Sequence, residues 1–493
     1  MTLGWRARAA CAFVGALGVA GMHAPDARAQ DAGAQDAGTP DEWGAGDGAF
    51  DFDVPAAALE APPPPRDWSL TGFLRSDWGL WAERLDDQPF AKGRQSLDVD
   101  LGYVHGPWRV KVAEHVEYDL AYTVDADAYD DPTIDAYRFR ALSGEQLVGF
   151  AAGPVEITVG RQIVAWGEGD VLSPLDVVNP RDNREPGLAD LDDLRLSVLA
   201  TRVGWFEGSH RVEAMVLHES YFGERAPPLA PFSPFRALLA SDPAAAALIA
   251  GKSFDYQHVQ DRFALDQQEP MLRWVYKGAG LDAGLYVASV LDDQGVVVLP
   301  TLLSLLAKDD IDIALDHRRY TATGLSAATS FGDFVMKWEV AAEIGRPYNT
   351  GDTSATVPVL DVAEVDTLTA MSGLAWSGVT DLTLAAEVQR GFGLDPPADL
   401  LVPLNLPVGA LRLSYRALRD RLTLNAAATS LGLRAQYGWL ARAEATYEIL
   451  DGFKAGVGFV HYGPGDEGKF GPFTGFDDHD RAFAKLRWDF VVY

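Results

Sequence analysis

Polar and apolar residues alternate along many short stretches of this chain. In residues 439–450 alanine, tyrosine and isoleucine occupy one face of an extended strand, and Arg442, Glu444 and Glu448 occupy the other. Successive strand side chains point to opposite sides, so this pattern indicates a two-faced strand. The same alternation recurs at residues 109–119, 334–341, 382–389 and 485–490. A recurring strand with one apolar and one polar face is typical of a transmembrane β-barrel, which has lipid outside and water inside.

Turn-forming residues divide the chain into hairpins. Glycine reaches positive φ and aspartate can bond its own backbone, so short turns are expected at 105–107, 153–154, 207–209, 277–280, 331–333, 377–379, 418–420 and 450–452. Longer connections are expected at 83–93, 123–133, 167–195, 222–269, 292–315, 346–361, 392–403, 433–436 and 463–478. Short and long connections alternate, as they do between the periplasmic and extracellular ends of bacterial barrels.

These turns predict an all-β, transmembrane antiparallel barrel of about 18 strands, within a range of 14–18. Sixteen strands is the main alternative. We expect the barrel to be closed, because lipid does not tolerate an open sheet edge. Glu114 would face lipid, which suggests a bulge or a position outside the hydrocarbon band. The third long loop is expected to fold inward, and short helices are expected in the extracellular loops.

The N-terminal part of the chain is predicted to contain a signal peptide followed by a linker. Arg6 and Arg8 precede an apolar run, and a small-x-small site ends at Ala29, which predicts a cleaved signal peptide over residues 1–29. A single membrane anchor is the alternative. Residues 30–66 repeat Gln-Asp-Ala-Gly and end in prolines, which predicts a periplasmic linker. Residues 67–493 would then form the barrel in the outer membrane of a Gram-negative cell.

Charge and cysteine content exclude several classes of function. The net charge of −30 argues against a nucleic-acid partner, which requires a basic surface. Cys11 is the only cysteine and lies in the signal, so the mature chain has no disulfide or thiolate metal site. No cofactor is expected. Acidic loops are interpreted as a solvated surface, with divalent cations bridging the loops as the alternative.

The densest cluster of chemically useful side chains lies in residues 160–195. A strand runs into a loop that contains glycine, proline and charges of both signs, which could form charge-assisted pairs if the loop folds against a charged wall. We therefore predict a lumen constriction formed by Arg161, Trp166, Glu168, Asp176, Asn179, Arg181, Asp182, Arg184, Asp192, Asp193 and Arg195. The lumen wall facing it would carry Lys337, Glu339, Glu387, Arg442, Glu444 and Glu448. Loop packing without a ligand role is the alternative.

The same stretch supports a family resemblance. Gly160-Arg161-Gln162, Trp166-Gly167 and Asp176-x-x-Asn179-Pro180 resemble a signature of an uncharacterised family of proteobacterial outer-membrane barrels, known as domain of unknown function 1302. The resemblance is convincing over roughly residues 154–205. It implies transport of hydrophobic molecules, with a periplasmic lipid-transfer protein or an inner-membrane exporter as partner.

Two further loops are unusually apolar, and enzymatic motifs are missing. Residues 231–251 and 296–307 could form a plug, a vestibule for apolar ligands, or a membrane contact. His479 lies among three aspartates and is interpreted as part of an acidic, exposed loop, in preference to a metal or catalytic site. No nucleophile elbow or zinc-hydrolase helix occurs in the sequence, so an enzyme is not expected.

The sequence therefore favours an outer-membrane channel for hydrophobic or amphipathic small molecules or lipids, which pass by gated diffusion. Outer-membrane lipids and such a ligand would be its partners. The alternatives are a general porin for small polar solutes and, with less support, an outer-membrane hydrolase. Substrate identity, direction of transport and oligomeric state cannot be read from the residues.

Overall fold

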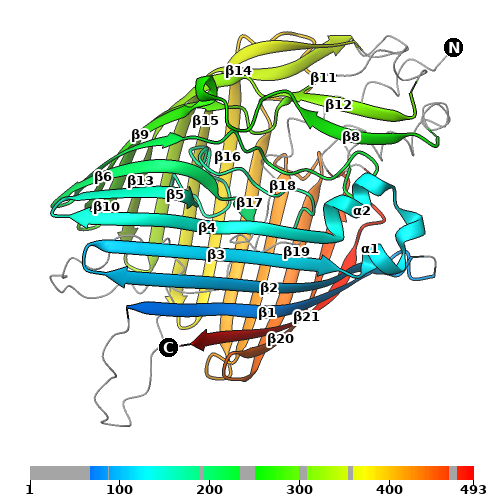
Figure 1. Cartoon of the computed structure of the whole chain (residues 1–493), viewed down its shortest axis with the longest axis horizontal. Helices are drawn as coiled ribbons and strands as arrows, with labels where there is room; N and C mark the ends of the chain where they lie inside the picture. Colours follow the sequence, from blue (N-terminus) through cyan, green and yellow to red (C-terminus); the bar gives the residue numbers. More distant parts are fainter. Residues whose placement is uncertain are drawn as a thin grey trace.

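Eighteen antiparallel strands form one sheet that closes into a barrel in the computed structural model (Figure 1). The structure describes residues 67–86, 88–187, 194–233, 250–298, 308–352, 359–465, 473 and 475–492. The predicted signal peptide and linker lie outside these residues. The barrel strands are β1(Trp68–Trp81), β2(Phe90–His105), β3(Trp108–Asp119), β4(Phe139–Ala152), β5(Val155–Gln162), β6(Val198–Glu207), β7(His210–Leu217), β9(Glu269–Gly278), β10(Leu281–Leu291), β13(Arg319–Phe331), β14(Phe334–Asp352), β15(Val359–Val379), β16(Leu382–Leu394), β17(Pro407–Ala417), β18(Leu422–Leu431), β19(Trp439–Leu450), β20(Phe453–Gly463) and β21(Arg481–Val492).

The first and last strands close the barrel. β1 pairs with β2 on one side and with β21 on the other, in an antiparallel register that runs from Leu70↔Val492 to Trp81↔Arg481. This pairing satisfies the backbone donors and acceptors that an open edge would expose to lipid. The predicted closed barrel and its strand number of 18 are confirmed.

The eight predicted short turns all join consecutive strands, and the nine longer connections lie at the opposite end of the barrel. One predicted connection is much shorter than expected. Residues 346–361 were predicted as a loop, but β14 continues to Asp352 and β15 begins at Val359. These two strands have 19 and 21 residues, whereas about 9–11 are enough to span the membrane. At the end opposite the short turns, β14 and β15 continue to pair with each other beyond the ends of their neighbours β13 and β16.

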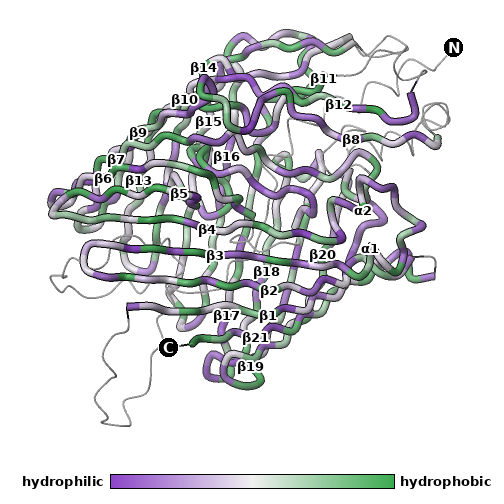
Figure 2. The backbone as a smooth tube through the Cα atoms, viewed as in Figure 1, coloured by the Kyte–Doolittle hydropathy of each residue, from purple (hydrophilic) through white to green (hydrophobic). Residues whose placement is uncertain are grey.

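Side-chain exposure alternates between the two faces of the wall. Leu411 and Val457 point outward and are 61% and 62% exposed, whereas Glu339 and Arg442 point inward and are 0% and 3% exposed. Figure 2 shows the same alternation as a change of colour along each strand. The bulge expected near Glu114 is confirmed, because the β3–β4 register shifts there.

The long connections carry the remaining elements. The helices are α1(Ala121–Val124), η2(Ala126–Ala128), α2(Asp131–Tyr137) and η3(Leu265–Gln267). Asp130 caps α2, because its side chain accepts a hydrogen bond from the backbone N–H of Thr133. A second sheet has the order β11(Val296–Val298), β12(Asp310–Asp316), β8(Ser253–His258) and was not predicted. Figure 1 places β8, β12 and the two α-helices away from the short turns.

Candidate constriction site

The connection between β5 and β6 is described over residues 163–187 and 194–197, which fold into the barrel and cross its lumen; we call these residues the lumen loop. β6, β7, β9, β10 and β13 lie between β5 and β14 in the sheet, yet the lumen loop bonds directly to β14 and β16. Further along, the backbone carbonyl of Pro186 accepts a hydrogen bond from the Tyr462 hydroxyl on β20. The loop therefore contacts walls on several sides of the barrel, as predicted.

Two carboxylates on the far wall hold the backbone of the lumen loop. Glu339 on β14 accepts hydrogen bonds from the N–H of Gly169 at 2.6 Å and from the Ser173 hydroxyl at 2.9 Å. Glu387 on β16 accepts three more N–H groups, from residues 170, 171 and 172, at 2.6, 3.0 and 2.7 Å. A carboxylate that accepts several N–H bonds forms a strong, charge-assisted anchor. We call these contacts the amide clamp.

Side-chain contacts support the same segment. Lys337 forms an ion pair with Asp170 at 2.6 Å, and the Ser326 hydroxyl donates to Glu168 at 3.4 Å. Trp166 is 3% exposed and lies with its ring centroid 5.3 Å from that of Tyr286. It belongs to an apolar cluster that the loop forms with the inner wall of β6–β14. This half of the lumen loop thus has an apolar side against the wall.

Asn179 and Asp176 join the two ends of the lumen loop. The Asn179 side chain accepts from the N–H of Val164 at 2.6 Å and donates to the carbonyls of Gln162 and Leu196 at 3.0 and 2.8 Å. Asp176 is bonded by Arg181 at 2.7 Å and by Arg195 at 3.0 Å. Burial would raise the pKa of Asp176, but these two guanidinium groups outweigh it and lower the pKa. The predicted Asp-x-x-Asn motif therefore fixes the loop's base.

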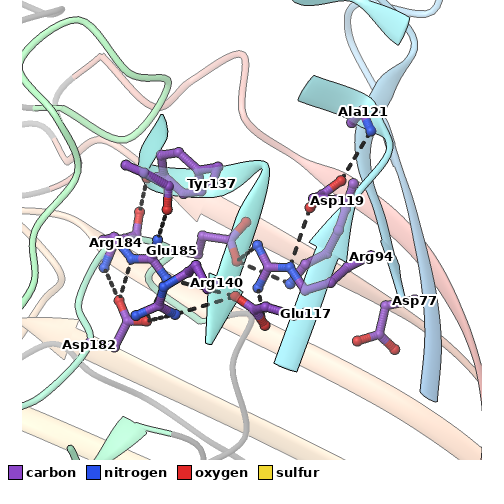
Figure 3. A network of polar contacts seen from close by, with 12 residues as sticks. Asp77, Arg94, Glu117, Asp119, Ala121, Tyr137, Arg140, Asp182, Arg184 and Glu185 are labelled. Atoms are coloured by element: carbon purple, nitrogen blue, oxygen red, sulfur yellow. Dashed lines mark hydrogen bonds and ion pairs between the residues drawn. The ribbon is translucent and has the colours of Figure 1, made fainter. Parts of the chain in front are cut away.

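A network of ion pairs holds the last part of the described loop against β2–β4 (Figure 3). Glu185 lies 3.0 Å from Lys92 and 2.9 Å from Arg94. Asp182 pairs with Arg184 at 2.8 Å and with Arg140 at 3.0 Å. Burial raises the pKa of Glu185, but Arg94, Lys92 and Arg481 outweigh it and lower the pKa to about 2. Both loop carboxylates are therefore charged at neutral pH.

Three residues of the predicted constriction have not yet been placed: Arg161, Asp192 and Asp193. Arg161 was predicted in the lumen, but it follows the outward row of β5, in which Val159 is 47% exposed. It lies at the end of the strand, where it bonds Ser197 and Glu219 and its side chain is only 15% exposed. Asp192 and Asp193 lie outside the described residues.

On the predicted lumen wall, Lys337, Glu339 and Glu387 contact the described part of the loop. Arg442 and Glu444 pair with each other, and Glu444 lies 3.4 Å from Lys485. Glu448 accepts from the N–H of Gly452 at the short-turn end, away from the loop. Strand alternation gave the correct face of the wall but no information on depth.

Sequence reasoning missed the basic residues that receive the loop carboxylates. Lys92, Arg94, Arg140 and Arg481 come from three separate strands and are far from the loop in sequence. The signal available was alternation, which places Lys92 and Arg94 on the inner face of β2. Nothing in the sequence paired them with Glu185.

The apolar loops contribute to a packed layer at the mouth of the barrel. Phe232 lies 5.4 Å from Phe476 and 6.0 Å from Trp81, measured between ring centroids. His479 was predicted to be exposed but is 0% exposed, because it packs against these rings and bonds the carbonyl of Pro231. Val296 and Val297 are buried in β11. Residues 234–249 and 299–307 of the predicted apolar loops lie outside the described residues.

The described part of the chain lacks two features. None of its helices is both long and apolar enough to cross a membrane. None of its groups of histidine, aspartate or glutamate is arranged to hold a metal ion.

A closed 18-stranded barrel with an apolar outer face and a charged inner face defines a transmembrane β-barrel protein. The chain belongs to the family described as protein of unknown function DUF1302, whose model matches residues 145–490.

Solved structures with a similar fold were found, but no curated protein sequence matches the chain. Pseudomonas aeruginosa OccK8 (OprE) is 12% identical, with 86% of this chain and 98% of that chain covered and a TM-score of 0.47. P. aeruginosa OpdK is 9% identical, with 86% and 99% covered and a TM-score of 0.47. Acinetobacter baumannii OccAB3 is 11% identical, with 86% and 100% covered and a TM-score of 0.44. Likeness at this level says nothing about substrate.

Proposed function

We propose that the protein is an outer-membrane channel that passes small amphipathic molecules through a lumen narrowed by the lumen loop. The amide clamp carries this proposal, because Glu339 and Glu387 hold the loop across the lumen from its attachment at β5. The packed aromatic layer at the mouth supports gated passage and argues against a permanently wide opening. An amphipathic cargo fits a lumen loop that meets both an apolar wall and ion-paired walls.

A general porin for small polar solutes is the second candidate, because the inner wall carries many charged side chains. The gated channel and the general porin differ in the width of the open path through the lumen. Transport of fully hydrophobic molecules or lipids, and a periplasmic lipid-transfer protein or inner-membrane exporter as partner, rest on the family resemblance alone.

Conductance in planar bilayers tests the proposal. We expect small, fluctuating currents from the full chain, and a clear increase in Glu339→Gln/Glu387→Gln, which weakens the amide clamp. Glu448→Gln is the matched control, because it removes a lumen carboxylate that is bonded at the short-turn end, to the N–H of Gly452. A large and steady current in the unaltered protein would establish the porin reading instead.

A further inference from the structure

Three arginines surround one glutamate on the inner face of β6, β7 and β9. Arg211 and Arg273 lie 2.6 and 2.8 Å from the two carboxylate oxygens of Glu213, and Arg202 lies 3.7 Å away. The register pairs Glu213 with Arg273 directly. Arg202 points inward, because its neighbour Val203 on β6 is 41% exposed on the outer face. The side chains of Arg211, Glu213 and Arg273 lie on the same inner face, where they contact one another. We call these four residues the arginine cluster.

The arginine cluster has more donors than its glutamate can satisfy. Each guanidinium carries five N–H donors, whereas one carboxylate offers about four acceptor positions. Within the described part of the chain, the buried Nε of Arg211 has no hydrogen-bond partner. The nearby carboxylate Glu156 is already bonded by Arg109 at 2.9 Å. The cluster therefore keeps a positive charge of about two in a chain whose net charge is −30.

The cluster is also open to the lumen and lies next to the constriction. The side chains of Arg202, Arg211 and Arg273 are 14%, 22% and 12% exposed, so a solute in the lumen can reach them. Arg273 donates to the carbonyl of Ala165 at 3.1 Å, which places the cluster against the lumen loop. A solute that passes the loop would meet these guanidinium groups.

Aromatic rings flank the arginines. The guanidinium of Arg211 lies 4.8 Å from the centroid of the Phe206 ring. Tyr286 is the cross-strand neighbour of Arg273 and contacts Trp166 of the lumen loop. Planar guanidinium groups match a carboxylate, and the partly exposed Phe206 ring beside them provides apolar surface for the rest of a ligand.

We infer that the arginine cluster is a binding subsite for the carboxylate of a small organic acid, with Phe206 beside the acid's apolar body. The inference rests on the proposed channel function, because the ligand arrives through the lumen. Glu213 holds the arginines in place and competes with the ligand for them. The subsite thus narrows the amphipathic cargo to organic anions.

Binding of benzoate to the purified full chain in detergent, measured by calorimetry, tests the inference. We expect benzoate to bind, and neutral benzamide and inorganic phosphate to bind at least tenfold more weakly. Arg211→Gln and Arg273→Gln should each raise the benzoate Kd at least tenfold. Equal binding of benzamide, or of phosphate, would overturn the assignment.

Two further variants separate a ligand role from a structural one. Arg487→Gln removes an inward arginine that pairs with Asp489 at 2.7 Å on another wall, and should change the Kd less than twofold. Glu213→Gln removes the competing carboxylate and should tighten benzoate binding; weaker binding would contradict the inference. Heat-modifiable migration on gels confirms that each variant still forms a barrel.

The same protein in planar bilayers distinguishes this inference from the proposed function. Benzoate binding without any current would refute the channel and keep the subsite. Currents of the expected size without benzoate binding would refute the subsite and keep the channel.

Discussion

Asn179 shows how much one side chain contributes to the lumen loop. Its amide makes three hydrogen bonds, one accepted and two donated, to backbone groups at both ends of the loop. The side chain is 4% exposed, so water cannot replace a lost partner without rearrangement. Leaving such buried backbone groups unsatisfied costs about 1–3 kcal/mol each.

Replacing Asn179 should loosen the loop without unfolding the barrel. Asn179→Asp keeps the acceptor for Val164 but places a carboxylate against two carbonyl oxygens. We expect faster proteolysis of the loop in outer-membrane vesicles and noisier currents, with heat-modifiable migration retained. Asn425→Asp is the control, because Asn425 accepts a hydrogen bond from the Ser414 hydroxyl on the neighbouring wall strand. Identical digestion of both variants would contradict this role for Asn179.

At the scale of elements, the lumen loop is held by two chemically different restraints. The amide clamp uses wall carboxylates and loop N–H groups, whereas the Glu185 network uses a loop carboxylate and wall cations. Only the second depends on the ionisation of a loop residue. The two restraints should therefore respond differently to acid.

Only strong acid should release the Glu185 end of the loop. The pKa of Glu185 is lowered from its ordinary value of 4.5 to about 2, so its stabilising contribution is complete above pH 4.5 and is lost as the pH falls towards 2. We expect the noise of the channel current to rise across that window. Glu185→Gln should be noisy at neutral pH and change little between pH 4.5 and 2. If the current noise of Glu185→Gln depends on pH as that of the unaltered protein does, the role assigned to Glu185 is wrong.

The small extracellular sheet should loosen in milder acid. His317 is 1% exposed, bonds the Asp292 carbonyl and stacks on Phe222, near His258 and Arg225. Burial lowers the pKa of His317 to about 3. Below pH 6.5 the released histidine takes a proton and the buried one does not, so stability falls from pH 6.5 towards 3. The hydrogen-exchange protection factors of residues 310–316 should therefore fall between pH 6.5 and 3, and they should fall less in His317→Phe.

At the scale of the whole molecule, the barrel depends on which face meets lipid. Leu411 lies in the middle of β17 and is 61% exposed, and Leu418 lies in the following short turn and is 64% exposed. Arginine costs about 2–4 kcal/mol at the bilayer midplane and little near the interface. Leu411→Arg should therefore lower the free energy of unfolding measured in lipid vesicles by about that amount. Leu418→Arg should leave it nearly unchanged, and equal losses would contradict the assigned membrane depth.

The architecture could be predicted because it depends on local signals. Alternation set the face of each strand, and residues such as Gly332 and Gly452, both at positive φ, set the turns. The site could be predicted only in part. Asp176 and Asn179 act within one loop, whereas Glu185 and Arg94 meet across the lumen. Such long-range pairing depends on strand tilt and loop path, which alternation does not encode.

The amide clamp has a consequence for how this family can diversify. Glu339 and Glu387 bind main-chain N–H groups, which every amino acid except proline provides. A change of side chain at residues 170–172 would therefore leave these N–H groups available, whereas Gly169 has no room for a Cβ, which would clash with the Leu172 carbonyl oxygen. Acids at positions 339 and 387 of the wall would thus hold loops that differ in their side chains, and hence in selectivity, on one barrel.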